Sequence, residues 1–140
     1  MQKIWEWAKE HLTRKEIKNK LLLATDNKGK TAWHLASEKG QLYVLEKIWY
    51  FAKQNITRKE IKSKILLGID NKGYTAWHVA AEKDQLYVLK KIWELAKENL
   101  TTEEISNNLL LATDIMCRTA LHVAAEGGKL DVLREIMGVG

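Results

Sequence analysis

Thr31-Ala32-Trp33-His34 recurs as Thr75-Ala76-Trp77-His78 and again as Thr119-Ala120-Leu121-His122, each copy beginning 44 residues after the one before. A fixed period between about 20 and 50 residues is typical of stacked repeats, in which each unit buries its apolar face only against its neighbours. This stretch therefore predicts an array of similar units. It says little about chemistry, because an array of this kind presents a surface and needs no catalytic group.

The repeat extends on both sides of this motif. The turn Asp-Asn-Lys-Gly at 26–29 returns at 70–73 and becomes Asp-Ile-Met-Cys at 114–117. The period divides the chain into a partial unit at 1–30, whole units at 31–74 and 75–118, and a partial unit at 119–140. Because the chain has no proline and no glycine- or serine-rich tract, we expect residues 1–140 to form one repeat domain. Both ends interrupt the pattern, as in a piece of a longer array.

One unit is expected to contain two helices, a shorter third helix and a turn. Thr31 is a predicted N-cap, Gly40 closes the first helix, and apolar residues at helical spacing predict a second helix over 41–54. The stretch at 57–60 is a Thr-x-x-Glu capping box, also present at 13–16 and 101–104, and it opens the third helix. The fold class expected is all-α, a helical solenoid with short turns or β-hairpin tips between units.

The order turn, Gly, x, Thr, x, x, His, x, Ala, Ala, followed by a leucine-rich second helix, resembles the ankyrin repeat. Residues 75–81 and 85–89 match it best. Two departures stand out: Ala32, Ala76 and Ala120 occupy the place of the family's proline, and the period is 44 instead of 33 residues. The extra residues coincide with the added short helix. An armadillo- or HEAT-like unit fits the length, but the turn directly before Thr-x-x-His favours the ankyrin resemblance.

The resemblance implies a structural role for the motif histidines, which would hydrogen-bond the threonine and nearby backbone. Three histidines on helices roughly 8–10 Å apart could not share one zinc ion, whose nitrogen ligands lie at about 2.0–2.1 Å. The tryptophans at one repeat position are expected to form a buried column. The residues expected to be structural are Thr31, His34, Thr75, His78, Thr119, His122, Trp5, Trp49 and Trp93.

Net charge raises the question of nucleic acid, since the chain carries +5. Residues 13–20 and 57–64 each sum to +3, whereas residues 101–108 sum to −2. A groove that follows phosphates should stay positive along the stack, so the sequence favours a solvated charged face and disfavours nucleic-acid binding. An acidic partner for the first two copies remains open.

Catalysis, cofactors and metals are not expected, because the sequence contains no enzyme signature and no metal-ligand spacing. No apolar run approaches the 18 or so residues of a membrane span. A single cysteine cannot form an internal disulfide, which favours a reducing, intracellular compartment.

The function expected is a non-enzymatic protein–protein interaction module of ankyrin type, whose partner binds the concave face and the turn tips. Mapped onto this sequence, the candidate partner-binding residues are Asn27, Lys28, Lys30, Glu38, Lys39, Asn71, Lys72, Tyr74, Lys83, Asp84, Ile115, Met116 and Arg118. The alternatives are an engineered or consensus-like scaffold without a natural partner, and a self-assembling array. Weak self-association is expected through apolar residues at the two ends: Trp5, Trp7, Ile136, Met137 and Val139.

Overall fold

The computed structural model describes residues 2–138 of the chain, and within that range it is entirely helical, with no strand. The first helices of the repeat are α3 (Ala32–Glu38), α6 (Ala76–Glu82) and α9 (Ala120–Glu126). The second helices are α4 (Leu42–Asn55), α7 (Leu86–Asn99) and α10 (Leu130–Met137), and α1 (Gln2–His11) precedes the first connecting segment. Each whole unit thus begins with a short helix and continues with a long one, as the apolar spacing predicts.

The connecting segments are the predicted third helices, but each changes its hydrogen bonding part-way. They are α2 (Arg14–Glu16) with η1 (Ile17–Leu22), α5 (Arg58–Glu60) with η2 (Ile61–Leu66), and α8 (Thr102–Ile105) with η3 (Ser106–Leu110). The η parts are π-helical, and each ends on an i→i+5 bond, as from Leu67 N to Lys62 O at 3.0 Å. The capping box is complete at Thr13 and Thr101. At Thr57 the reciprocal backbone bond is missing, and one Glu60 oxygen is engaged by Lys18.

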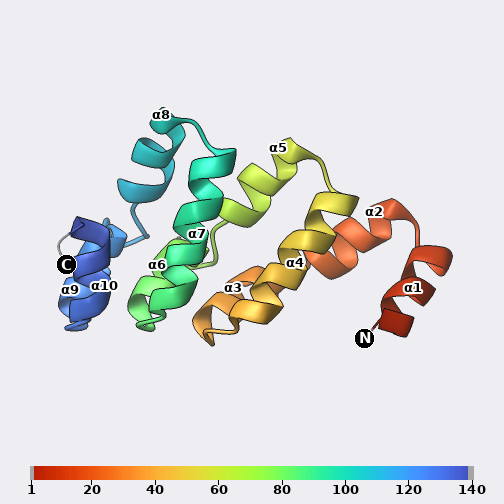
Figure 1. Cartoon of the computed structure of the whole chain (residues 1–140), viewed down its shortest axis with the longest axis horizontal. Helices are drawn as coiled ribbons and strands as arrows, with labels where there is room; N and C mark the ends of the chain where they lie inside the picture. The colour runs from red at the N-terminus through yellow and green to blue at the C-terminus, as the bar shows by residue number, and fades with distance from the viewer. Residues whose placement is uncertain (1, 139–140) are drawn as a thin grey trace.

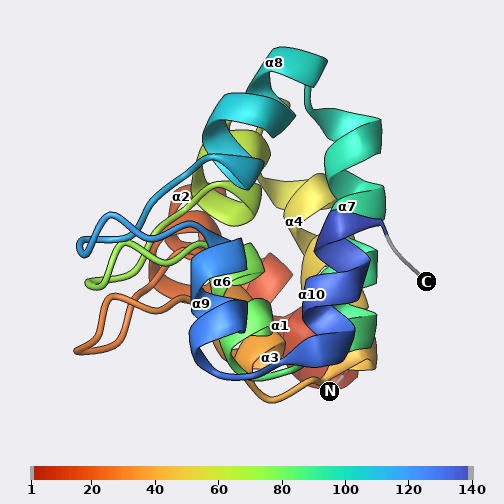
Figure 2. The same ribbon diagram turned by 90° about the vertical axis from the view of Figure 1, so that its left-hand side faces the viewer.

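The elements form three rows. The first helices α3, α6 and α9 pack side by side, each against the second helix that follows it. The connecting segments form a row of their own along the upper edge (Figure 1). Viewed along the long axis, the turns project on one side of the first helices and the second helices lie on the other (Figure 2). Segment η1 packs against α4 and η2 against α7, so these two connecting segments support the second helix of the following unit.

The core lies between these rows. Trp33 and Trp77 of the first helices are 0% and 3% exposed, and their rings lie 5.7 and 5.9 Å from those of Trp49 and Trp93. The predicted apolar face of the connecting helix, Ile61, Ile65 and Leu66, is buried as well. These side chains belong to one apolar core that continues through the units.

The predicted tryptophan column is only partly correct. Trp49 is buried, but Trp93 and Trp5 are half-buried. Trp93 faces α10, which has 8 residues where α4 and α7 have 14, and a hollow of about 270 Å³ opens between Trp93 and Ile136. Trp5 lies against Phe51 with ring centroids 4.5 Å apart. The more deeply buried tryptophans are those of the Thr-Ala-Trp-His motif.

Candidate interaction surface

The three turn tips form one connected edge. Asn71 N donates to Lys28 O at 2.9 Å, and its side-chain Nδ2 donates to Asn27 O at 3.0 Å. One unit further, Ile115 N donates to Lys72 O at 2.9 Å. Because backbone atoms of each tip bind the next, the tips are held relative to one another and do not hang as separate loops (Figure 2). The predicted β-hairpin alternative is wrong, because no strand forms here within residues 2–138.

An aspartate shapes each tip. Asp26 Oδ1 accepts hydrogen bonds from Lys28 N and Lys30 N, both at 2.9 Å. Asp70 and Asp114 repeat these two bonds in their own turns. The backbone donor of Lys30 holds the pKa of Asp26 below its usual value, and at Asp114 such donors outweigh the opposing effect of burial. The carboxylates of Asp26 and Asp114 are therefore ionised parts of their turns.

A hollow of about 340 Å³ lies between the tips and the ends of α3 and α6. Among the predicted partner-binding residues that line it are Asn27, Lys28, Lys30, Glu38, Asn71, Lys72 and Lys83. No residue of the connecting helices lines it. The tertiary structure thus brings seven of the sequence-predicted candidates to one concave surface.

Each first helix carries a glutamate near its end, and a side chain eight residues before it binds that glutamate. Lys30 pairs with Glu38, and Tyr74 Oη donates to Glu82 Oε2 at 2.8 Å. Arg118 Nη1 donates to Glu126 Oε2 at 2.9 Å. Lys30 and Arg118 offset the negative charge of Glu38 and Glu126, whereas Tyr74 gives Glu82 a neutral hydrogen bond. The hydrogen bond from Lys30 keeps the pKa of Glu38 below its usual value.

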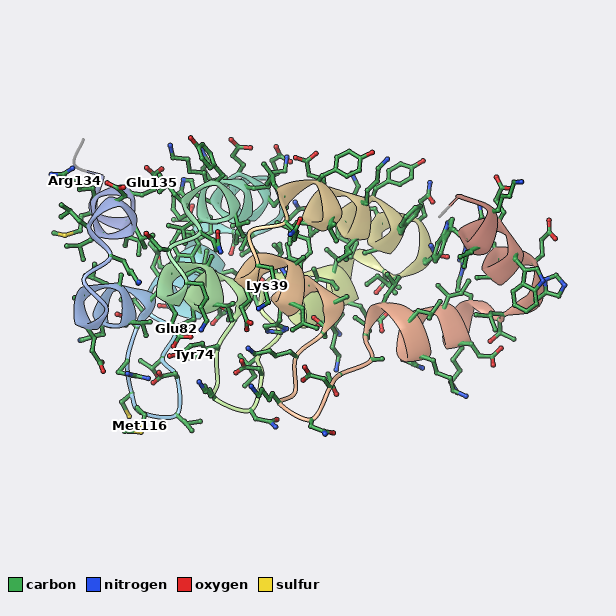
Figure 3. The ribbon with its side chains drawn as sticks, turned by 90° about the horizontal axis from the view of Figure 1, so that it is seen from below. Lys39, Tyr74, Glu82, Met116, Arg134 and Glu135 are labelled. Carbon is green, nitrogen blue, oxygen red and sulfur yellow. The ribbon has the colours of Figure 1, made fainter. Side chains whose placement is uncertain are left out.

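Tyr74 requires a correction, because it is 2% exposed and cannot serve as a contact residue. Its ring stacks on His78 at 5.6 Å, and its hydroxyl also accepts from Arg118 Nη2 at 3.2 Å. Burial and the Glu82 carboxylate raise the pKa of Tyr74 well above its usual value. The side chain that looked like part of the surface therefore links two units from inside (Figure 3).

The remaining candidates lie at the rim of this surface. Lys39 and Asp84 are exposed at the ends of the first helices. Ile115 and Met116 are each 68% exposed at the third tip, and Figure 3 shows Met116 at its outer end. Arg118 is half-buried because it bonds Asp114, Glu126 and Tyr74. The exposed apolar pair thus borders a polar, mostly charged hollow.

The motif histidines serve the fold and lie away from this surface. His34 Nε2 donates to the carbonyl oxygens of Gly68 at 3.0 Å and Tyr74 at 3.1 Å, and His78 Nε2 donates to Ala112 O at 3.0 Å. Both Nδ1 atoms lie 3.0 Å from the hydroxyl of the preceding threonine. Burial lowers the pKa of both rings, so they are held neutral.

The third copy of this motif departs from the expectation. His122 keeps its contacts to Thr119 but is exposed. His34 and His78 are covered by the segment that leads from their own unit into the following one, and within residues 2–138 no such segment follows α9. Leu121, at the position of the two buried tryptophans, is 36% exposed for the same reason.

Sequence reasoning missed several exposed apolar side chains. Ile69 and Leu111 are each 63% exposed beside the tips. The exposure of Ile69 could have been predicted, because the equivalent residues of the other copies, Thr25 and Thr113, are polar. Tyr43 and Tyr87 are 71% and 73% exposed on α4 and α7, each beneath a lysine of the same helix. The added helices therefore do not cover these tyrosines.

The end residues are exposed to different degrees. Trp7 is 58% and Met137 is 60% exposed, whereas Ile136 is half-buried. Val139 lies outside the described residues. Between residues 2 and 138, no cluster of three or more His, Cys, Asp or Glu side chains is placed to hold a metal ion, and no helix has the length and apolarity to cross a membrane.

Comparison with known proteins shows the fold but no family. No family model and no curated protein sequence matches the chain. Its structure is similar to a chain in the crystal structure of the yeast ribosomal protein Rps3 in complex with its chaperone Yar1. The TM-score is 0.72 and the identity 19%, over 95% of this chain and 80% of that chain. At this identity the similarity shows a shared fold alone.

These findings contradict the predicted membership of the ankyrin repeat family, since no family model supports it. The differences from the ankyrin repeat lie in the repeating unit itself. Each connecting segment adds a π-helical stretch such as Ile61–Leu66, and alanine occupies the three positions where proline was expected. What is shown is an all-helical chain with the rows described above.

Proposed function

We propose that this chain is a protein-binding module whose partner lies along the connected tips and the adjoining ends of the first helices. The observation that carries the proposal is the exposed pair Ile115 and Met116 at the third tip, where Ile115 N is hydrogen-bonded to the backbone oxygen of Lys72, a residue that lines the tip hollow. Exposed apolar side chains next to polar and charged ones are typical of protein interfaces. The similar structure supports the proposal, because it is that of a ribosomal protein in complex with its chaperone.

The proposal includes a solenoid arrangement, supported by rows whose equivalent helices pack on one another at a 44-residue period. A rigid row suits a binding surface because little conformational entropy is lost on association. The proposal assigns no enzymatic step and no cofactor. His34 and His78, the buried titratable rings, use both nitrogens for hydrogen bonds within the fold. We also propose a reducing, intracellular compartment, on the ground that Cys117 is an exposed free thiol.

The test compares proteins captured by the wild-type chain with those captured by two variants. Ile115→Ser/Met116→Ser removes the apolar pair, and Tyr43→Ser/Tyr87→Ser removes exposed side chains from the second helices. Quantitative mass spectrometry should show partners that are lost with the first variant and kept with the second. If the wild-type chain and both variants capture the same proteins to the same extent, the tips are not the binding surface. If none of the three chains captures any protein above background, the alternative of a scaffold without a natural partner would fit instead.

A second candidate function is self-association through the two ends. Ile4 and Trp7 are 74% and 58% exposed on α1, and Met137 is 60% exposed on α10. A contact between unlike ends would extend into chains, whereas a contact between like ends would stop at a dimer. Sedimentation equilibrium in reducing buffer should show a mass that rises with concentration and falls back for Trp7→Ser. A strict monomer at the highest concentration would remove this candidate.

A further inference from the structure

Two equivalent hollows lie along the row of connecting segments, on different residues from the tip surface. The first has a volume of about 620 Å³ and the second about 560 Å³. Arg14, Lys15, Lys18 and Glu60 line the first, and Arg58, Lys59, Lys62 and Glu104 line the second. Each residue of the second set lies 44 positions after its counterpart in the first. The hollows are therefore one repeated feature, formed where each connecting segment meets the next.

An ion pair crosses each hollow. Lys18 Nζ lies 3.0 Å from Glu60 Oε2, and Lys62 Nζ lies 3.0 Å from Glu104 Oε1. The Lys18 hydrogen bond is the main cause of the lowered pKa of Glu60, and the Thr101 backbone followed by Lys62 lowers that of Glu104. Both glutamates are thus ionised at neutral pH, and each offsets only one of the cations around it.

The other cations remain available to a ligand. Arg14 and Lys15 at the first hollow, and Arg58 and Lys59 at the second, are exposed and form no ion pair with any side chain of residues 2–138. Lys53 adds a further positive charge to the first hollow. Fixed like charges gathered in a concavity concentrate the field that attracts an oppositely charged ligand.

We propose that this edge binds an acidic protein segment in extended form, with one carboxylate in each hollow. Arginine and lysine side by side suit a carboxylate, since arginine can bind both oxygens and lysine adds a point charge. Packed helices are roughly 10 Å apart, which an extended chain covers in about three residues. A segment with acidic residues at that spacing would therefore reach both hollows. Leu67, half-buried in the second hollow, offers apolar contact to its backbone and β-carbons.

Charge along the row favours an acidic protein over nucleic acid. The third connecting segment reverses sign, with Glu103 exposed and no lysine or arginine in residues 101–108. A phosphate backbone that followed the row would meet this repulsion, whereas a short acidic peptide ends before it. The residues that line the two hollows include no aromatic side chain on which a base could stack.

The experiment measures fluorescence anisotropy of a labelled oligoglutamate peptide at low ionic strength, and of a labelled single-stranded oligonucleotide of similar extended length. Lys15→Glu/Lys59→Glu reverses one exposed, unpaired cation in each hollow. Lys47→Glu/Lys90→Glu changes the net charge equally on the second helices, where both lysines are exposed. Lys15→Ala/Lys59→Ala is a milder second variant. Circular dichroism establishes that each variant is folded.

We expect the peptide to bind the wild-type chain, and to bind Lys15→Glu/Lys59→Glu about tenfold more weakly, which corresponds to about 1.4 kcal/mol. The matched control, Lys47→Glu/Lys90→Glu, should keep most of the wild-type affinity for the peptide. The affinity of Lys15→Ala/Lys59→Ala should lie between those of the wild type and Lys15→Glu/Lys59→Glu. Equal losses in both charge-reversal variants would overturn the proposal, because net charge alone would then explain binding. If the oligonucleotide binds more tightly than the peptide, and Lys15→Glu/Lys59→Glu weakens its binding as well, the ligand of this edge would be a nucleic acid and the proposal of an acidic peptide would be wrong. Ile115→Ser/Met116→Ser should bind the peptide like wild type, so this test and that of the proposed function can fail separately.

Discussion

Gly29 is the position at which the contact between tips can be tested most directly. Its φ is +78°, and a Cβ placed there would lie 2.9 Å from Asn71 N and 2.4 Å from Asn71 Oδ1. Gly29→Ala therefore combines a left-handed backbone with a collision against the next tip. Gly128 is a matched control, because its φ is +66° and a Cβ there would meet nothing within 4 Å.

The magnitudes follow from these two environments. A left-handed backbone costs an alanine about 1–2 kcal/mol, of which about 0.4–1 kcal/mol is offset by the stiffer unfolded chain. Gly128→Ala should therefore lose about 1 kcal/mol. Gly29→Ala should also disturb the two hydrogen bonds from Asn71 to the first tip, at about 0.5–1.5 kcal/mol each. Its total loss should be about 2–4 kcal/mol.

Urea unfolding followed by circular dichroism measures both losses, provided that the slope of free energy against urea is unchanged. Gly29→Ala should shift the midpoint at least twice as far as Gly128→Ala. Similar shifts for the two variants would refute the reasoning, since the tips would then be independent loops. In that case the connected edge on which the proposed binding surface rests would not exist in solution.

Cys117 occupies the position of Gly29 and Gly73 with φ of +60°, so Cys117→Gly should gain about 0.5–1 kcal/mol in urea unfolding; a loss would mean that the thiol makes a stabilising contact. Trp77→Ala should lower the free energy of unfolding by about 3–5 kcal/mol and Trp93→Ala by clearly less, because of these two side chains only Trp77 is buried. Equal thermal midpoints for the two variants would contradict this prediction. The lowered pKa values of His34 and His78 predict that stability falls as pH decreases below about 6.5.

The sign of the pH effect follows from proton binding. Below about 6.5 an unfolded histidine binds a proton, whereas His34 and His78 stay neutral in the fold because burial lowers their pKa. The unfolded state therefore binds more protons, and the free energy of unfolding decreases until the folded pKa is passed. Urea midpoints between pH 7 and 5 measure this decrease. His34→Gln/His78→Gln should flatten the profile, and an unchanged slope in that variant would assign the effect to other groups.

Local interactions explain what could be predicted. The N-caps at Thr31 and Thr75 and the connecting helix opened by Thr57 each depend on residues within a few positions in the chain. The apolar face of Ile61, Ile65 and Leu66 follows from helical spacing in the same way. The i→i+5 hydrogen bonds of these segments could not be predicted from the sequence, because the same residue types occur in α-helices and π-helices.

Exposure at the candidate surface was harder to predict, because it depends on the neighbouring unit. Tyr74 stands at the position of Lys30 and Arg118, which suggests a surface residue, but its ring is covered by contacts to His78 and Arg118. The opposite holds for His122, which repeats a buried motif but is exposed. Pattern identifies equivalent positions, and only packing decides which of them reach solvent.

The sequence by itself determined the repeat period, the helices with their caps and the all-helical class, because each depends on short-range spacing along the chain. The tertiary structure decided which side chains meet across units. Asn71 reaches the backbone of Asn27, 44 residues away, and Lys18 reaches Glu60. Such contacts depend on the offset and rotation between stacked units, which are set by the volumes of many packed side chains together. The connected tips and the paired hollows therefore exist only once the units are stacked.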